Sequence, residues 1–145
     1  MHRRLLVLAS ALLFTWLSDA ARAVDNTVAR ADARQVRAVV EAQLDAFARD
    51  DAERAFSYAA PSIRSMFGDA ERFMAMVRRS YPVVYRPAAV AFLVAEADGD
   101  EVVQPVHFTD AEGTVWLAVY RLERQPDRSW RISGCVVAPS SGRTT

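Results

Sequence analysis

Residues 114–137, TVWLAVYRLERQPDRSWRISGCVV, decide the fold class. Apolar residues recur with a period of two on both sides of residues 125–128, Gln-Pro-Asp-Arg, which are typical of a turn. The stretch therefore predicts two neighbouring antiparallel strands, residues 114–123 and 129–137.

Two more strands are predicted before this pair. Residues 88–96 form a first long strand, and the Asp-Gly pair at 98–99 is a strong hairpin signal that leads into residues 102–109. A turn at 110–113 then joins the third strand. Four consecutive strands predict an antiparallel meander.

The chain before the strands has helical periodicity. Residues Asp32-x-x-Gln35 form a capping box that predicts the start of the first helix, which continues to Phe47 and beyond. Charged residues at four-residue steps, Arg37, Glu41, Asp45 and Arg49, predict its solvated side.

Two further helices are predicted. Asp50-x-x-Glu53 repeats the capping pattern for a short second helix, which Pro61 is expected to end. Residues 62–67 are expected as a short turn or strand, and Asp69 as the N-cap of a third helix that Tyr81-Pro82 closes. Residues 81–87 are expected to be extended.

Helices followed by strands predict an α+β domain, with three N-terminal helices packed on a curved four-stranded, or longer, antiparallel sheet. We expect a single cone-like domain at residues 32–137, between a flexible lead (24–31) and a flexible tail (138–145). The third strand is apolar on both faces, which predicts that the second face of the sheet is also covered. A second copy of the chain, giving a homodimer, is the simplest covering.

Three runs carry a family resemblance: VRAVVEAQLDAFARDDAERAFSYAAPSIRSMFG (36–68), FMAMVRRSYPVVYRP (73–87) and VWLAVYRLERQPDRSWRISGCVV (115–137). They resemble a bacterial family of secreted proteins of unknown function. The order of elements resembles the cone-shaped fold of the nuclear transport factor two-like superfamily, which ketosteroid isomerases and polyketide cyclases share. The resemblance implies the fold and leaves the activity open, because that family has no assigned activity.

The N-terminus has the pattern of a cleavable signal peptide (residues 1–23). A basic start precedes an apolar run at residues 5–17, and Ala21-Arg22-Ala23 predicts cleavage after Ala23. The apolar run is too short to span a bilayer as a helix, so no stable membrane anchor is expected after cleavage. The sequence thus predicts a periplasmic or secreted protein.

Composition argues against several classes of function. The 18 basic and 18 acidic residues balance, which argues against a broad nucleic-acid surface. After cleavage at Ala23, His107 and Cys135 are the remaining histidine and cysteine, too few for a structural metal site. No Gly-x-Ser-x-Gly elbow or phosphate-cradling glycine loop is present, so no cofactor is expected. Cys135 is expected either buried in a strand or available to another chain.

Polar residues in apolar surroundings are the candidate ligand-binding residues. They are Gln43, Tyr81, Tyr85, Gln104, His107, Trp116 and Tyr120. Each also has a structural interpretation: Gln43 can bond to strand backbone, a tyrosine hydroxyl can be bonded within the core, and His107 can face solvent. Arg121 and Arg131 are weaker candidates, since both can pair with exposed carboxylates.

Isomerase chemistry needs a carboxylate base in the pocket. The strand carboxylates lie at strand ends or turns, and Asp50 and Asp51 have the pattern of helix caps, so no catalytic residue is proposed. The leading hypothesis is therefore an exported binding or accessory module for a small apolar ligand or a partner. Alternatives are a pocket enzyme with acid/base chemistry, using Tyr85 or His107 as donor, and a purely structural domain.

Overall fold

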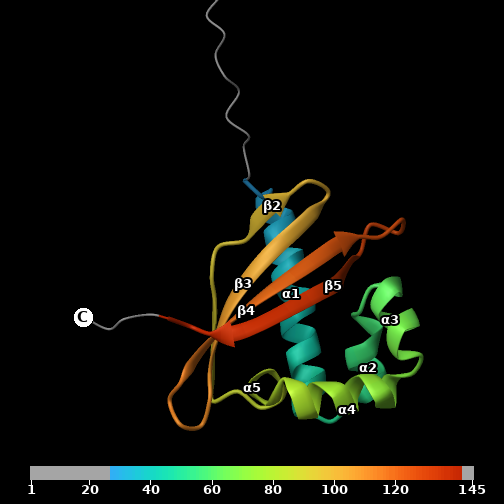
Figure 1. Cartoon of the computed structure of the whole chain (residues 1–145). Helices are drawn as coiled ribbons and strands as arrows, with labels where there is room; N and C mark the ends of the chain where they lie inside the picture. The colour runs from blue at the N-terminus through green and yellow to red at the C-terminus, as the bar shows by residue number, and fades with distance from the viewer. Residues whose placement is uncertain (1–26, 142–145) are drawn as a thin grey trace, which may run out of the picture.

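The computed structural model describes residues 27–141, so the predicted signal peptide and its cleavage point lie outside the described residues. Figure 1 shows helices that precede an antiparallel sheet. The elements are α1 (Arg30–Ala48), α2 (Ala52–Ser57), α3 (Pro61–Phe67), α4 (Ala70–Ser80), α5 (Pro82–Tyr85), β1 (Ala89–Phe92), β2 (Glu96–Asp98), β3 (Glu101–Thr109), β4 (Val115–Arg124) and β5 (Trp130–Pro139). The predicted α+β class is confirmed.

The sheet has the order β1-β3-β4-β5, and β2 also pairs with β3. Every pair is antiparallel. Gln104 of β3 and Cys135 of β5 lie opposite Tyr120 of β4. The register shifts between Arg121 and Leu122, where β5 has an extra residue at Ser133. Such a bulge bends its strand and increases the local twist, which helps the sheet to curve.

The helices cover one face of this sheet, which we call the inner face. Side chains of β3 alternate between buried and half-buried positions, with Val106 and Phe108 fully buried against the helices. Figure 1 shows α1 running along this face and α2, α3 and α4 gathered at one end of it. Phe47 of α1 and Met74 of α4 are fully buried in the same core. Burying a side chain of this size stabilises the fold by about 1.5–3 kcal/mol.

The first two helices begin differently from the predictions. α1 begins at Arg30, ahead of the predicted capping box, and no side chain caps it. Asp32 instead forms an ion pair with Arg124, which ties the first turn of α1 to the end of β4. α2 is capped by Asp51, whose carboxylate accepts a hydrogen bond from the backbone N–H of Arg54, and not by Asp50.

The solvated side of α1 is as predicted. Arg37 pairs with Glu41 at 2.6 Å, and Arg49 pairs with Asp45 at 3.1 Å.

The prediction of a turn or strand at residues 62–67 is wrong, because this segment is α3. Pro61 occupies the first turn of α3, where the missing N–H of proline costs nothing and its fixed φ favours a helix. The linker between α2 and α3 bonds to the start of β5: the N–H of Ile132 donates to Tyr58 O, and the N–H of Ala60 donates to Ile132 O, both at 2.8 Å. The expected N-cap Asp69 is confirmed for α4.

The segments around the sheet also differ from expectation. The stretch predicted as extended at residues 81–87 contains the single helical turn α5. The predicted long strand at 88–96 is divided, because β1 ends at Phe92 and β2 begins at Glu96. The start of the predicted tail at residue 138 belongs to β5, which continues to Pro139. At the other end, Thr27 of the expected flexible lead forms a β-bridge with Glu96.

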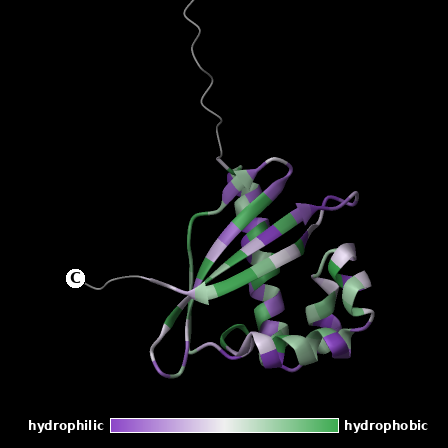
Figure 2. Ribbon diagram, viewed as in Figure 1, coloured by the Kyte–Doolittle hydropathy of each residue, from purple (hydrophilic) through white to green (hydrophobic). Residues whose placement is uncertain are grey.

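The outer face of the sheet is half-exposed and largely apolar. Across it, His107 lies between Ala91 of β1 and Leu117 of β4, and Val119 lies beside Val136 of β5. Figure 2 shows the hydrophobic colouring of much of β4 and β5. Val136 is 70% exposed. No helix of the described residues packs on these positions, so the second apolar face predicted from the sequence is present.

Candidate functional site

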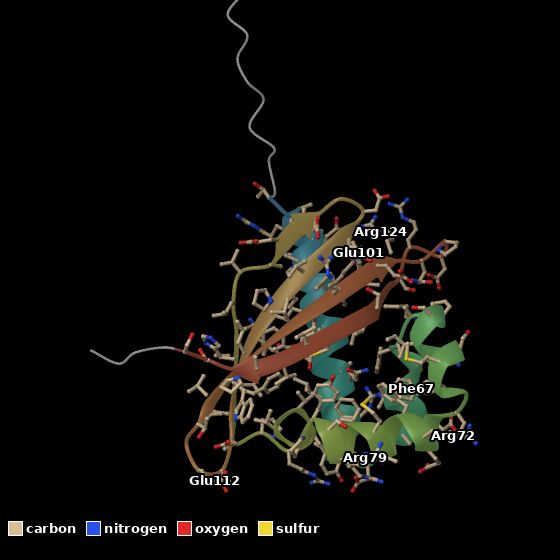
Figure 3. The ribbon with its side chains drawn as sticks, in the orientation of Figure 1. Phe67, Arg72, Arg79, Glu101, Glu112 and Arg124 are labelled. Atoms are coloured by element: carbon tan, nitrogen blue, oxygen red, sulfur yellow. The ribbon has the colours of Figure 1, made fainter. Side chains whose placement is uncertain are left out.

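A cavity of about 440 Å³ lies between the helices and the inner face of β4 and β5. Phe47 of α1, Val77 of α4 and Ile132 of β5 contribute to its apolar wall. Phe67, labelled in Figure 3, lines it from α3. Met66 also lines the cavity and is 74% exposed, so it marks the rim. The volume lies within the range of about 300–1,000 Å³ that is common for small-molecule sites.

Three of the seven candidate residues line this cavity: Gln43, Tyr81 and Tyr120. Gln43 is 4% exposed, and its Nε2 donates a hydrogen bond to Ala55 O at 3.1 Å. Its partner is thus a helix carbonyl of α2 and not the strand backbone considered from the sequence. The bond satisfies part of the amide and fixes it in the wall.

Tyr120 and Cys135 form the polar part of the sheet side of the cavity. Tyr120 is 1% exposed, and its hydroxyl has no hydrogen-bond partner of good geometry in the described part of the chain. Burial raises the pKa of this hydroxyl well above 10.0, and the neighbouring Cys135 contributes. Burial likewise raises the pKa of the Cys135 thiol to about 12. Both groups are therefore neutral at physiological pH, and the thiol is a poor nucleophile.

Tyr85 lies outside the cavity and belongs to an exposed polar cluster. Its hydroxyl donates a hydrogen bond to Asp50, which also accepts from Arg78 and Arg86 at 3.0 Å each. The bond from Tyr85, followed by the bond from Arg78, lowers the pKa of Asp50. Asp50 has a φ of 53° and lies one residue before Asp51, which occupies the N-cap position of α2.

Gln104 is buried, and its Nε2 donates to Leu93 O at 2.9 Å and Pro105 O at 2.8 Å. The amide of Gln104 thus provides hydrogen bonds to backbone carbonyls near the end of β1, which is a structural role. His107 lies on the outer face and does not reach the cavity.

Trp116 lines a second hollow, about 330 Å³ in volume, between α5 and the β3–β4 turn. Its Nε1 donates to Asp110 at 2.9 Å and lowers the pKa of that carboxyl.

The two weaker arginine candidates bond within the protein. Arg121 pairs with Asp98 at 2.7 Å and Glu101 at 2.8 Å, as expected for an exposed cation. Arg131 donates to the carbonyl of Ser57 instead of a carboxylate.

Sequence reasoning missed two features of the site region. The sequence predicts burial or pairing for Cys135, and only the strand register shows that it lies beside Tyr120. The sequence predicts a helix cap at Asp50, and no sequence signal distinguishes its cluster with Tyr85 from an ordinary helix start.

Within residues 27–141, no three His, Cys, Asp or Glu side chains gather in a way that can hold a metal ion. No helix in that range combines the length and apolarity needed to cross a membrane.

Comparison with known proteins places the chain in a family. The sequence model described as "Domain of unknown function (DUF4864)" matches residues 29–145. The chain belongs to the DUF4864 family. No curated protein matches this DUF4864 chain.

Solved structures give the fold of the DUF4864 chain. An NTF-2-like protein of unknown function from Silicibacter pomeroyi DSS-3 is similar, with a TM-score of 0.50 and 20% sequence identity. The match covers 74% of this chain and 94% of that one. The cone-like fold expected from the sequence resemblance is confirmed, and the relationship adds no activity.

Proposed function

We propose that this DUF4864 protein is an exported binding module whose inner cavity holds a small apolar ligand. The observation that carries the proposal is the cavity of about 440 Å³, whose lining contains aromatic and aliphatic side chains and no charged ones. A concave apolar site with a few polar groups is the usual form of a small-molecule site. Export rests on the signal-peptide pattern of residues 1–23.

Binding is better supported than acid/base catalysis. A general base works best with a pKa near the operating pH. The pKa values of Tyr120 and Cys135, which line the cavity, are raised away from that range. Asp50 accepts hydrogen bonds from three side chains outside the cavity, and its pKa is lowered, which makes this carboxylate a weaker base.

A second copy of the chain stays our prediction for the outer face of the sheet. Support comes from the apolar positions on β3, β4 and β5 that no helix of the described residues covers, including Val119 and the exposed Val136. A two-fold interface would place this face against itself. This role is compatible with a ligand in the cavity, because the two features lie on opposite faces of the sheet.

Native mass spectrometry of the protein purified from the exported fraction tests the proposal. We expect a non-covalent mass above that of the chain, which organic extraction removes and which can then be identified. The blocking variant is Val77→Phe, since Val77 is 4% exposed and lines the cavity. Val94→Phe is the matched control, because Val94 is 83% exposed and does not line the cavity.

The wild type and the control are expected to retain the added mass, and Val77→Phe to lose it while its circular dichroism stays native. Equal retention by the blocking variant and the control would place the ligand elsewhere and contradict the proposal. If the wild type carries no added mass and also fails to bind an added apolar probe, the binding proposal is contradicted and a purely structural or interaction role is favoured.

A further inference from the structure

We infer that the cavity selects a neutral ligand and that the Tyr120 hydroxyl donates a hydrogen bond to an acceptor oxygen of that ligand. This inference rests on the proposed function and deepens it, because it names the chemistry of the ligand. Two independent observations carry it: the absence of charged residues from the cavity lining, and the buried hydroxyl of the lining residue Tyr120, which has no bonding neighbour besides the weak Cys135 thiol.

The cavity lining contains no charged side chain that could pair with a charged ligand. No Asp, Glu, Arg or His lines the cavity. The nearby helices do carry charges, but Figure 3 shows Arg72 and Arg79 of α4 pointing away from the sheet and into solvent. Moving a carboxylate or ammonium group into such surroundings without a partner costs far more than burying a neutral polar group. Neutral molecules are therefore favoured over fatty acids and amines.

The second observation is the state of the Tyr120 hydroxyl, compared with the hydroxyls of Tyr58 and Tyr85. Tyr85 donates to Asp50, and the hydroxyl of Tyr58 accepts from Arg54 at 3.4 Å. The Tyr120 hydroxyl, by contrast, is fully buried and has only the Cys135 thiol, a weak hydrogen-bonding group, as a neighbour to bond with. Buried hydroxyl groups are nearly always bonded, so an orphan at a binding cavity indicates a bond that the ligand completes.

Two other buried polar groups of the described residues also lack a partner, Trp130 Nε1 and Ser133 Oγ. Neither residue lines the cavity. Ser133 is the extra residue of the β5 bulge, which has no partner residue on β4. Of the three residues that carry these groups, only Tyr120 lines the cavity.

A matched set of two-ring probes tests the inference on the full chain after organic extraction and refolding. The probes are 2-acetylnaphthalene, which has one acceptor oxygen, 2-ethylnaphthalene, which has none, and 2-naphthoate, which is charged at pH 7.5. Dissociation constants are measured by titration calorimetry for the wild type, Tyr120→Phe and the control Tyr58→Phe. Tyr58 is a suitable control because its hydroxyl is bonded outside the cavity.

We expect Tyr120→Phe to weaken binding of 2-acetylnaphthalene about tenfold, which corresponds to about 1.4 kcal/mol. Binding of 2-ethylnaphthalene is expected to stay unchanged in all three proteins, Tyr58→Phe to match the wild type, and 2-naphthoate to bind more weakly than either neutral probe.

Equal losses for the acetyl and ethyl probes, or no loss for either, would overturn the role of Tyr120 while the binding function stands. Tighter binding of 2-naphthoate would overturn the preference for neutral ligands. Failure of both neutral probes to bind the wild type would overturn the proposed function itself.

Discussion

Replacement of Tyr120 by phenylalanine is expected to stabilise the ligand-free protein. Tyr120 is 1% exposed, and its hydroxyl has no well-placed partner in the described part of the chain. Folding therefore removes this group from water without an equivalent bond in return. The ring of phenylalanine fills the same space, so the substitution removes the polar group and creates almost no cavity.

The size of the effect follows from the cost of an unsatisfied buried group, about 1–3 kcal/mol. Contact with the Cys135 thiol recovers part of that cost, since a thiol is a weak hydrogen-bonding group. A gain of about 1 kcal/mol in the free energy of unfolding remains. A buried hydroxyl with a good partner would give the opposite sign, a loss of about 1 kcal/mol.

Urea unfolding of the extracted protein measures the difference. With an m-value of about 2 kcal/mol/M, the gain moves the midpoint up by about 0.5 M. Thermal unfolding is expected to show a rise of about 4 °C. Tyr58→Phe is the control and is expected to change the midpoint little, because its bond is long and exposed.

A fall of 1 kcal/mol or more in Tyr120→Phe would refute this reasoning, because it would show that the hydroxyl is well bonded in the empty protein. The expected gain, together with weaker ligand binding, would show instead that the residue lowers stability for the benefit of binding, as functional sites often do.

The other predictions concern three separate places. Because the pKa of Asp50 is lowered in the fold, its contribution is present above the ordinary value of 3.8 and lost as the pH falls through the folded value. Asp50→Asn is therefore expected to have a lower Tm than the wild type at pH 7, and this difference in Tm is expected to disappear in acid. The Cys135 thiol, with a pKa of about 12, is expected to resist iodoacetamide at pH 8 in the native protein and to react in urea, as mass spectrometry can show. Val119→Glu on the outer face is expected to leave a folded monomer by light scattering.

Each of these three predictions has an outcome that would contradict it. If the difference in Tm between Asp50→Asn and the wild type stays unchanged in acid, the effect comes from the backbone conformation and not from the charge of Asp50. Rapid alkylation of native Cys135 would show an open, activated thiol. A native assembly that is unchanged by Val119→Glu would remove the outer face as an interface.

The sheet was largely predictable because its signals are local. Alternation identified three of the strands, and turn signals identified the connections between them, with glycine at 99 and 113 and Gln-Pro-Asp-Arg at 125–128. Gly99 and Gly113 have φ values of 60° and 85°, conformations that favour glycine and that the Asp-Gly and 110–113 signals anticipate.

Proline was ambiguous among the helices. Pro61 was expected to end α2, but α2 ends at Ser57 and Pro61 begins α3. The same fixed φ is compatible with both roles, and the choice depends on the bonds of Tyr58 and Ala60 to a distant strand. A local signal cannot contain that information.

The site was predictable only in part for the same reason. Tyr120 and Gln43 were candidates because each is polar within an apolar pattern, and both line the cavity. Cys135 joins them through the bulge at Ser133: in a regular strand, residues 132 and 135 would face opposite sides, whereas both line the cavity here. Tyr85 was expected to be extended and instead lies at the end of α5, which turns it toward Asp50.

The bond between Ile132 and the α2–α3 linker has a consequence for the order of folding. It joins residues more than 70 positions apart, at the start of the last strand of the sheet. Contacts of such long sequence separation are slow to form, because loop closure must precede them. The helical half can collapse early, yet the cavity has its sheet wall only after β5 docks. If the cavity binds a ligand as proposed, binding must follow the docking of β5, because Ile132, Gly134 and Cys135 line the cavity from that strand.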